Sequence, residues 1–157
     1  MSKLEFCEAS QEDIPKIVKL LKETILEVYG QILPRDRLEP WIEGDRLESD
    51  VNQIWQKMIV AQLDDEIVAL AASLEDKVAI IWVHPAHHRN GIGSALLDIV
   101  EAEIRNSGYE KATLDCFSDN HKALCFYQAK GWKILSPEMD EYAGAMKTIM
   151  TKTLNAN

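Results

Sequence analysis

The fold of this chain is decided by residues 83–97, which read Val-His-Pro-Ala-His-His-Arg-Asn-Gly-Ile-Gly-Ser-Ala-Leu-Leu. The apolar run 78–83 is typical of a strand, and His84-Pro85 ends that strand because proline cannot continue the ladder. From Ile92 onward, apolar residues recur at helical spacing. The stretch therefore predicts a strand, a turn with two glycines, and a helix that follows directly.

This turn has the features of an anion-binding site. Gly91 and Gly93 let the backbone take positive φ and approach a ligand closely. The first turn of the helix presents free N–H groups and the positive end of its dipole, which suit a pyrophosphate. The candidate binding residues are consecutive: His88, Arg89, Asn90, Gly91, Ile92, Gly93 and Ser94. Taken alone, the glycine pair is more typical of a tight connection between strand and helix.

Two other nucleotide-binding motifs are excluded. A dinucleotide-binding fingerprint needs a third glycine where this chain has Leu96. A P-loop needs Gly-Lys followed by Ser or Thr, and this triplet does not occur.

The whole chain predicts one α/β domain of the α+β type, covering residues 1–157. Seven segments have strand patterns, namely 4–7, 58–63, 67–73, 78–83, 111–117, 132–135 and 145–154. Four segments have helical patterns, namely 14–28, 45–56, 92–107 and 120–130. We expect a mostly antiparallel sheet of about seven strands flanked by about four helices. The stretch 31–50 is expected to be irregular before its helix begins, and 136–144 to be a loop.

Composition and charge narrow the range of partners. The 157 residues carry a net charge of -9, which argues against nucleic acid or an anionic membrane. No apolar run reaches the roughly 20 residues of a membrane span, and the N-terminus lacks a signal-peptide pattern. Cys7, Cys116 and Cys125 are predicted to be reduced and buried. We therefore expect a soluble cytoplasmic protein, either a monomer or a homodimer.

Two segments resemble the GNAT N-acetyltransferase superfamily. Residues 83–97 are similar to its acetyl-CoA-binding motif, Gln/Arg-x-x-Gly-x-Gly/Ala between a strand and a helix. Residues 120–132, Asn-His-Lys-Ala-Leu-Cys-Phe-Tyr-Gln-Ala-Lys-Gly-Trp, are similar to its Asn-x-x-Ala-x-x-Phe-Tyr-x-x-x-Gly-Phe segment. The order of elements agrees over essentially the whole chain, and the one departure is His88, where the family has Gln or Arg. The resemblance implies an N-acetyltransferase that uses acetyl-CoA.

The resemblance also implies where acetyl-CoA lies. The sheet would open between strands 78–83 and 111–117, and the pantetheine arm would occupy the gap. The backbone of Ile81, Trp82 and Val83 would pair with the pantetheine amides. An N–H in this stretch would hold the thioester carbonyl as negative charge develops on its oxygen.

Catalytic roles follow from the same resemblance. Tyr127 would be the general acid that protonates the CoA thiolate, and Asn120 would contact the cofactor arm. From spacing alone, Tyr127 is typical of a core tyrosine and Asn120 of a helix N-cap. Asp115 would be the general base, because a glutamate has this place in the ribosomal-protein acetylating branch. The side chain of aspartate is shorter than that of glutamate, which favours a bridging water between Asp115 and the amine. Glu75 is an alternative general base, and Asp115 could also be a solvated carboxylate with no catalytic role.

The histidines of the turn raise the possibility of a metal site. His84, His87 and His88 are crowded into five residues, with no matching ligand cluster elsewhere in the sequence. This is poor metal geometry. We therefore expect no metal and a solvated loop that helps to neutralise phosphate.

The predicted reaction is direct attack of an amine on the thioester in a ternary complex. A ping-pong route through Cys116 or Cys125 is less favoured, because neither has an evident histidine partner. The alternative from a different class is a non-catalytic acyl-CoA-binding or sensor module on the same fold.

The acceptor is not readable from the motifs. Segments 31–50 and 136–144 are expected to shape its pocket, and Tyr29, Trp41 and Trp55 are candidate lining residues with apolar packing as the default. Both segments are acidic, which predicts a cationic acceptor, either a small amine or a protein amine. The same acidity also fits a merely solvated surface.

Overall fold

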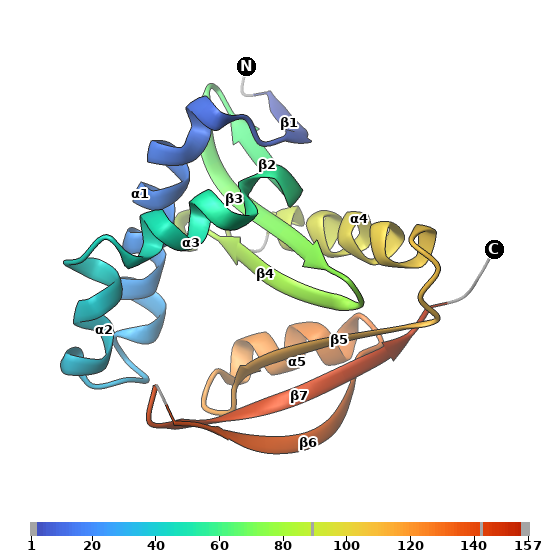
Figure 1. Ribbon diagram of the computed structural model, residues 1–157. Coiled ribbons are helices and arrows are strands. Elements are labelled where there is room, and N and C mark those ends of the chain that lie inside the picture. The colour runs from blue at the N-terminus through green and yellow to red at the C-terminus, as the bar shows by residue number, and fades with distance from the viewer. Residues whose placement is uncertain (1–2, 89, 142, 155–157) are drawn as a thin grey trace.

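The computed structural model describes residues 3–88, 90–141 and 143–154, apart from the side chains of residues 40 and 41. Its centre is one seven-stranded sheet in the order β1-β2-β3-β4-β5-β7-β6 (Figure 1). The strands are β1 (Leu4–Glu8), β2 (Met58–Leu63), β3 (Glu66–Leu74), β4 (Lys77–Val83), β5 (Lys111–Phe117), β6 (Lys133–Asp140) and β7 (Ala145–Thr153). The α-helices are α1 (Ile14–Thr24), α2 (Arg35–Ile42), α3 (Arg46–Ile54), α4 (Ile92–Asn106) and α5 (His121–Ala129).

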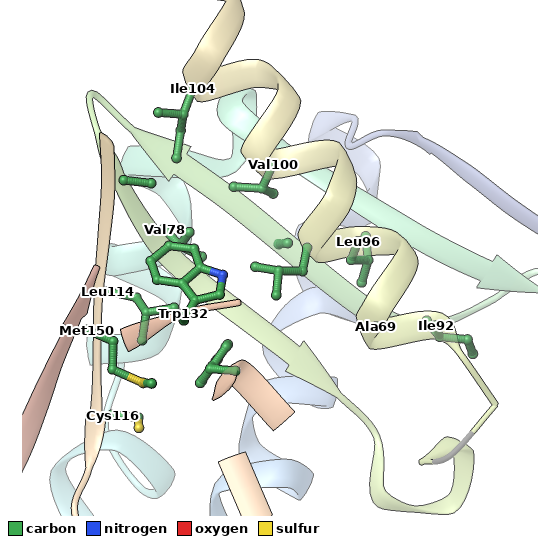
Figure 2. Packing of buried hydrophobic residues seen from close by; sticks show 14 of the residues in the cluster. Ala69, Val78, Ile92, Leu96, Val100, Ile104, Leu114, Cys116, Trp132 and Met150 are labelled. Carbon is green, nitrogen blue, oxygen red and sulfur yellow. The ribbon is translucent and has the colours of Figure 1, made fainter. Parts of the chain in front are cut away.

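Each face of the sheet has its own hydrophobic core, because successive side chains of a strand point to opposite faces. On one face, Leu96 and Val100 of α4 pack toward the sheet and toward Trp132, which follows α5 (Figure 2). On the other face, α1 and α3 bury residues such as Ile17 and Val51. Burying each such aliphatic side chain stabilises the fold by about 1.5–3 kcal/mol. The two cores therefore cover the two faces of the sheet.

β4 and β5 are neighbouring strands that separate. They form the parallel pair of the sheet, and Lys77↔Thr113 is the one residue pair described between them. β4 pairs with β3 as far as Val83, and β5 pairs with β7 as far as Phe117. Figure 1 shows β4 and β5 parting toward their C-terminal ends. Beyond the shared pair, one edge of β4 therefore faces a gap in the sheet.

The helices differ from the expectation at one point. The structure has a mixed α/β fold with the seven strands expected, but five α-helices instead of about four. The missed helix is α2, inside the segment predicted to be irregular. Half of its residues are charged and it contains Pro40, so its helical periodicity is weak, and burial of Leu38 anchors it instead. Within the described residues, no helix is long and apolar enough to cross a membrane.

The loop predicted over 136–144 is wrong in its first half. Residues Lys133–Asp140 form β6, which pairs with β7 and has a register shift between Ile134 and Ser136. Pro137 made this run resemble a loop. β6 is an edge strand, which is where a sheet tolerates proline.

The prediction of buried cysteines is also wrong for two of the three. Cys116 is buried, whereas Cys7 and Cys125 are exposed, and all three are free thiols. Cys7 lies on β1, an edge strand that is exposed throughout. Cys125 is an exposed residue of α5, whose neighbouring Phe126 and Tyr127 supply the contacts with the core.

Candidate active site

The turn between β4 and α4 is shaped by a histidine and a left-handed glycine. Nδ1 of His84 accepts a hydrogen bond from the N–H of Ala86 at 3.1 Å, and its Nε2 lies 3.2 Å from Oε2 of Glu23 on α1. Gly91 has a φ of 78°, a conformation that glycine adopts without strain. α4 begins at the next residue, so the turn delivers the chain directly into the helix.

Gly93 has a different role from Gly91. A Cβ atom at Gly93 would meet Val83 Cγ2 at 3.4 Å and Phe126 Cζ at 3.6 Å. At Gly91 no described atom lies within 4 Å of such a Cβ, so the positive φ alone requires glycine there. Gly93 therefore brings α4 close to β4 and α5, while Gly91 makes the turn.

The first turn of α4 has the properties of an anion site. The N–H groups of residues 92–94 precede the first intrahelical bond, which Ala95 N–H donates to Gly91 O at 3.1 Å. The helix dipole adds partial positive charge at this end. Asn90 and Gly91 are exposed, so solvent reaches the turn. Arg89, predicted to contribute here, lies outside the described residues. We call the segment 90–94 the cradle.

His88 is directed at the end of β4. Its Nε2 lies 2.9 Å from the carbonyl oxygen of Val83. A carbonyl oxygen only accepts, so Nε2 is the protonated nitrogen and donates this hydrogen bond. The imidazole thus binds backbone next to the cradle, a contact that the sequence did not indicate.

Two peptide groups of β4 face the gap beside β5. Opposite residues of an antiparallel pair alternate between hydrogen-bonded and non-hydrogen-bonded positions. The N–H of His84 donates a hydrogen bond of 2.9 Å to a carbonyl oxygen of β3, so His84 occupies a hydrogen-bonded position. Trp82, two residues earlier, therefore forms the next hydrogen-bonded pair, with Leu70. Ile81 and Val83 therefore turn their N–H and C=O groups away from β3 and toward the gap.

Tyr127 of α5 is buried beside β5. Its ring centroid lies 5.2 Å from that of Phe126 and 6.3 Å from that of Trp132. Burial raises the pKa of Tyr127 far above its usual range, and the nearby Cys116 and Asp115 add to the increase. The hydroxyl therefore keeps its proton at neutral pH and well above it.

Tyr29 joins the parted strands from the opposite face. It ends the π-helical turn Ile25–Tyr29, and its ring contacts Trp82 of β4 at 5.1 Å and Phe117 of β5 at 5.0 Å between centroids. Burial also raises the pKa of Tyr29, and its charge acts on that of Tyr127. Sequence analysis predicted Tyr29 as a candidate lining residue of the acceptor pocket with packing as the default, and it did not predict the contacts with Trp82 and Phe117, because a π-helical turn has no recognisable sequence signal.

Asp115 is held between two lysines. Its Oδ2 lies 2.9 Å from Nζ of Lys77 on β4, and its Oδ1 lies 3.5 Å from Nζ of Lys147 on β7. Lys147 also lies 2.8 Å from Asp140. Burial lowers the pKa of Lys147, but the hydrogen bond to Asp140 and the charge of Asp115 outweigh burial and leave that pKa raised. Glu75, the alternative base, is exposed in the β3–β4 turn.

An acidic hollow lies next to Asp115. Its volume is about 390 Å³, and it is lined by Asp115, Glu138, Met139, Asp140, Glu141, Lys147 and Ile149. Four carboxylates face one ammonium, so the hollow is negative. At its β6–β7 hairpin, a Cβ on Gly144 would lie 3.4 Å from the guanidinium of Arg37 on α2. The two acidic segments expected to shape a pocket thus approach one another, although the side chain of Trp41 lies outside the described residues.

Comparison with known proteins identifies this arrangement. A model of the acetyltransferase (GNAT) family matches residues 18–132, which include the cradle, Asp115 and Tyr127. The chain belongs to the GNAT acetyltransferase family. This GNAT protein is 26% identical over 132 residues to peptidyl-lysine N-acetyltransferase YiaC of Escherichia coli (strain K12), with 82% of each chain covered.

Two further relatives of this GNAT protein are informative. Uncharacterized protein YxbD of Bacillus subtilis (strain 168) is 34% identical over 73 residues, which cover 45% of this chain and 46% of YxbD. The chain thus matches less than half of that relative. PaiA N-acetyltransferase from Thermoplasma acidophilum, solved in complex with coenzyme A, superposes with a TM-score of 0.82 at 18% identity. The superposition covers 96% of this chain and 99% of PaiA, and it shows a shared fold.

As a GNAT N-acetyltransferase, the protein belongs to a family that uses acetyl-CoA. The residues present fit this coenzyme: the cradle has N–H groups that lack a partner within the helix and suit phosphate, and β4 has outward peptide groups that suit amides. Asn120 caps α5, because its Oδ1 accepts from the N–H of Ala123 at 3.3 Å, which confirms its N-cap role. Among the described residues, no three His, Cys, Asp or Glu side chains are placed to hold a metal ion.

Proposed function

We propose that this GNAT protein transfers an acetyl group from acetyl-CoA directly to a cationic amine in a ternary complex. The observation that carries the proposal is the gap between β4 and β5. Peptide groups of β4 face this gap, the cradle adjoins the end of β4, and Tyr29 and Tyr127 approach from opposite faces. The acidic hollow beside Asp115 supports a cationic acceptor.

In the proposal, this chain binds the coenzyme mainly through backbone. The N–H groups of residues 92–94 bind the pyrophosphate beside Asn90 and Gly91, and the charge of Arg89, expected from the family resemblance, favours the same anion. Peptide groups of residues 81–83 pair with the pantetheine amides. Trp82 supports this stretch through its ring contact with Tyr29, and Asn120 contacts the arm from the start of α5. His88 holds the Val83 carbonyl until the coenzyme competes for this edge.

Proton transfers are assigned to two side chains. Asp115, directly or through one water, takes a proton from the acceptor ammonium, and the freed amine forms the new C–N bond. A β4 N–H holds the oxygen of the tetrahedral intermediate. As the C–S bond breaks, Tyr127 gives its proton to the leaving sulfur. Acetyl-CoA supplies the activated thioester. The nitrogen of the new amide loses its second proton to solvent, solvent returns a proton to Tyr127, and Asp115 releases its proton, so that one proton is set free for each acetyl group transferred.

Direct transfer is favoured over an acetylated cysteine. Cys116 is close enough to Tyr127 for its charge to raise the pKa of that tyrosine. Burial and, to a smaller extent, Asp115 raise the pKa of Cys116 itself to about 11. The thiolate is the nucleophilic form, so little of it is present at neutral pH. Replacing Cys116 and Cys125 together should leave turnover largely intact; loss of turnover with loss of a CoA burst would contradict direct transfer.

The acceptor class follows from the charge of the hollow. Glu138 and Glu141 are exposed carboxylates without a described cationic partner, while Asp115 and Asp140 share Lys147. A polyamine, an aminoglycoside-like amine, a protein N-terminus or a lysine side chain fits this field. The name of YiaC, a peptidyl-lysine N-acetyltransferase, adds weight to the lysine.

A panel of amines tests the proposed function. The panel includes polyamines, aminoglycosides, lysine peptides, N-terminal peptides and neutral or anionic amines, and release of CoA thiol is measured. We expect the highest kcat/KM for amines with a second positive charge. Equal or higher kcat/KM for neutral or anionic amines would refute the charge argument, and no release with any amine would favour an acyl-CoA sensor.

We also propose that the protein is cytoplasmic and that it is either a monomer or a homodimer. Three free thiols fit a reducing compartment. The homodimer would use β6, whose Ile134, Leu135 and Met139 are exposed apolar residues on a sheet edge. Sedimentation equilibrium distinguishes the two states.

A further inference from the structure

Lys130 lies beside the cradle, although it occupies a variable position in the family segment 120–132. It is the C-cap residue of α5. Its Nζ lies 2.8 Å from Oγ of Ser94 and 2.7 Å from Oδ1 of Asp98. Ser94 belongs to the first turn of α4, and Asp98 lies one turn further along. A full positive charge is therefore held at the N-terminal end of α4, in a chain whose net charge is -9.

The contact with Ser94 determines what its hydroxyl can do. An ammonium has donors only, so Oγ of Ser94 must accept this hydrogen bond. The hydroxyl proton of Ser94 is then free to be donated to another acceptor. The backbone N–H of Ser94 is also unpaired within the helix. Lys130 thus prepares Ser94 to donate twice to an anion at the cradle.

The contact with Asp98 is easily exchanged. The side chain of Asp98 is 62% exposed, whereas that of Lys130 is 21% exposed. Ion pairs with exposed carboxylates are weak, because water screens them. A phosphate held by helix N–H groups would offer Lys130 a charge-assisted hydrogen bond of the same kind as the one that Asp98 accepts. Lys130 could exchange Asp98 for a phosphate oxygen by a side-chain movement alone.

We propose that Lys130 binds the pyrophosphate of coenzyme A together with the first turn of α4, and that Asp98 competes with the phosphate for Lys130. This inference rests on the proposed coenzyme site. It predicts opposite effects for the two partners of one ion pair. Loss of Lys130 weakens coenzyme binding, whereas loss of the Asp98 charge strengthens it. A purely structural clamp between α4 and α5 would respond to both changes in the same direction.

The test is isothermal titration of the full chain with CoA, 3′-dephospho-CoA and pantetheine. We expect Lys130→Gln to weaken both CoA and 3′-dephospho-CoA roughly tenfold, since one charge-assisted hydrogen bond is lost. Asp98→Asn should tighten both about twofold to threefold. Pantetheine, which has no pyrophosphate, should bind all variants alike. Lys111→Gln, an equal charge change on β5 near the opposite end of α4, should bind CoA like the wild type.

Several outcomes would overturn the proposal. Unchanged CoA affinity in Lys130→Gln, or equal weakening in Lys130→Gln and Asp98→Asn, would make the pair a structural clamp. If Lys130→Gln lowers the affinity for CoA but not for 3′-dephospho-CoA, Lys130 binds the 3′-phosphate instead of the pyrophosphate. Melting temperatures measured without ligand show whether each variant folds. If Lys130→Gln does not fold, the test uses Lys130→Arg and Asp98→Asn instead. Lys130→Arg is expected to bind CoA within threefold of the wild-type affinity. If the wild type binds neither nucleotide, the proposed coenzyme site itself fails.

Discussion

The ammonium of Lys77 lies 2.9 Å from the carboxylate of Asp115, and this ion pair joins β4 to β5 close to the point at which the strands part. The side chains are 47% and 25% exposed, so the pair contributes only about 0–1 kcal/mol to stability. Asp115 is therefore well positioned without being essential to the fold. Its replacement should be seen mainly in catalysis.

Asp115→Asn preserves the shape of the side chain but removes the proposed base. We expect kcat to fall about 100-fold or more, with the CoA dissociation constant within twofold of the wild type. Steady-state kinetics with a fixed amine and titration of CoA measure both quantities. Lys77→Gln is the matched control: it breaks the same ion pair and should leave kcat within about threefold. A full kcat with a raised KM for the amine would make Asp115 an acceptor-binding residue instead.

Tyr127→Phe removes only the phenol oxygen of the proposed acid. We expect kcat to fall roughly 100-fold, because the leaving thiolate then takes its proton from solvent. CoA affinity and melting temperature should change little. Tyr109→Phe, on a tyrosine that is 39% exposed, is the control and should be silent. If Tyr127→Phe has the kcat of the wild type, Tyr127 is a core residue and not the general acid.

Gly91→Ala tests the cradle through its backbone. At a φ of 78°, an added Cβ costs about 1–2 kcal/mol of stability, and relief of this strain distorts the turn. We expect CoA affinity to fall about tenfold or more. Gly108→Ala is a matched control, since Gly108 follows α4 with a φ of 100° and no described atom within 4 Å of an added Cβ. It should lose similar stability in urea unfolding and bind CoA normally; equal CoA losses in both would assign the effect to stability.

The local signals in the sequence were sufficient for most of the fold. A proline that ends a strand and a glycine pair before a helix predicted β4, the turn and α4, and the structure confirms them. α2 was missed because its residues have little periodicity and its stability comes from tertiary burial of Leu38. The predicted strand 132–135 is the start of β6, but Pro137 made its continuation to Asp140 look like a loop, because an edge strand can only be recognised once the strand order is known.

The candidate site was less readable because its contacts join distant segments. Lys147 meets Asp115 only through the register of β5 against β7, which no local pattern specifies. Lys130 meets Ser94 and Asp98 through the packing of α5 on α4. Tyr29 contacts Trp82 and Phe117 from a π-helical turn, which has no recognisable sequence signal. Motifs therefore predict the residues of the proposed coenzyme site, while their charge partners depend on tertiary structure.

The Cys116 thiol gives a test at alkaline pH. Burial, with a smaller effect of Asp115, raises the pKa of Cys116 from 9.0 to about 11 in the folded protein. The folded state therefore holds this proton more tightly than the unfolded chain. The resulting stability is fully present below about pH 9 and is lost as pH rises toward 11. At 1.36 kcal/mol per pKa unit, the complete effect is on the order of 3 kcal/mol.

Cys116→Ala removes this contribution together with the smaller effect of the Cys116 charge on the pKa of Tyr29 and Tyr127, which are present in both proteins. At pH 7 the variant should be less stable by about 1 kcal/mol, since a buried sulfur atom is lost. Between pH 8 and 11 the wild type should lose roughly 2–3 kcal/mol more than the variant, so that the two curves converge and cross. Urea unfolding at half-unit pH intervals measures both free energies. Parallel curves over this range would mean that Cys116 ionises equally easily in the folded and unfolded states, and would reopen the thiolate as a nucleophile.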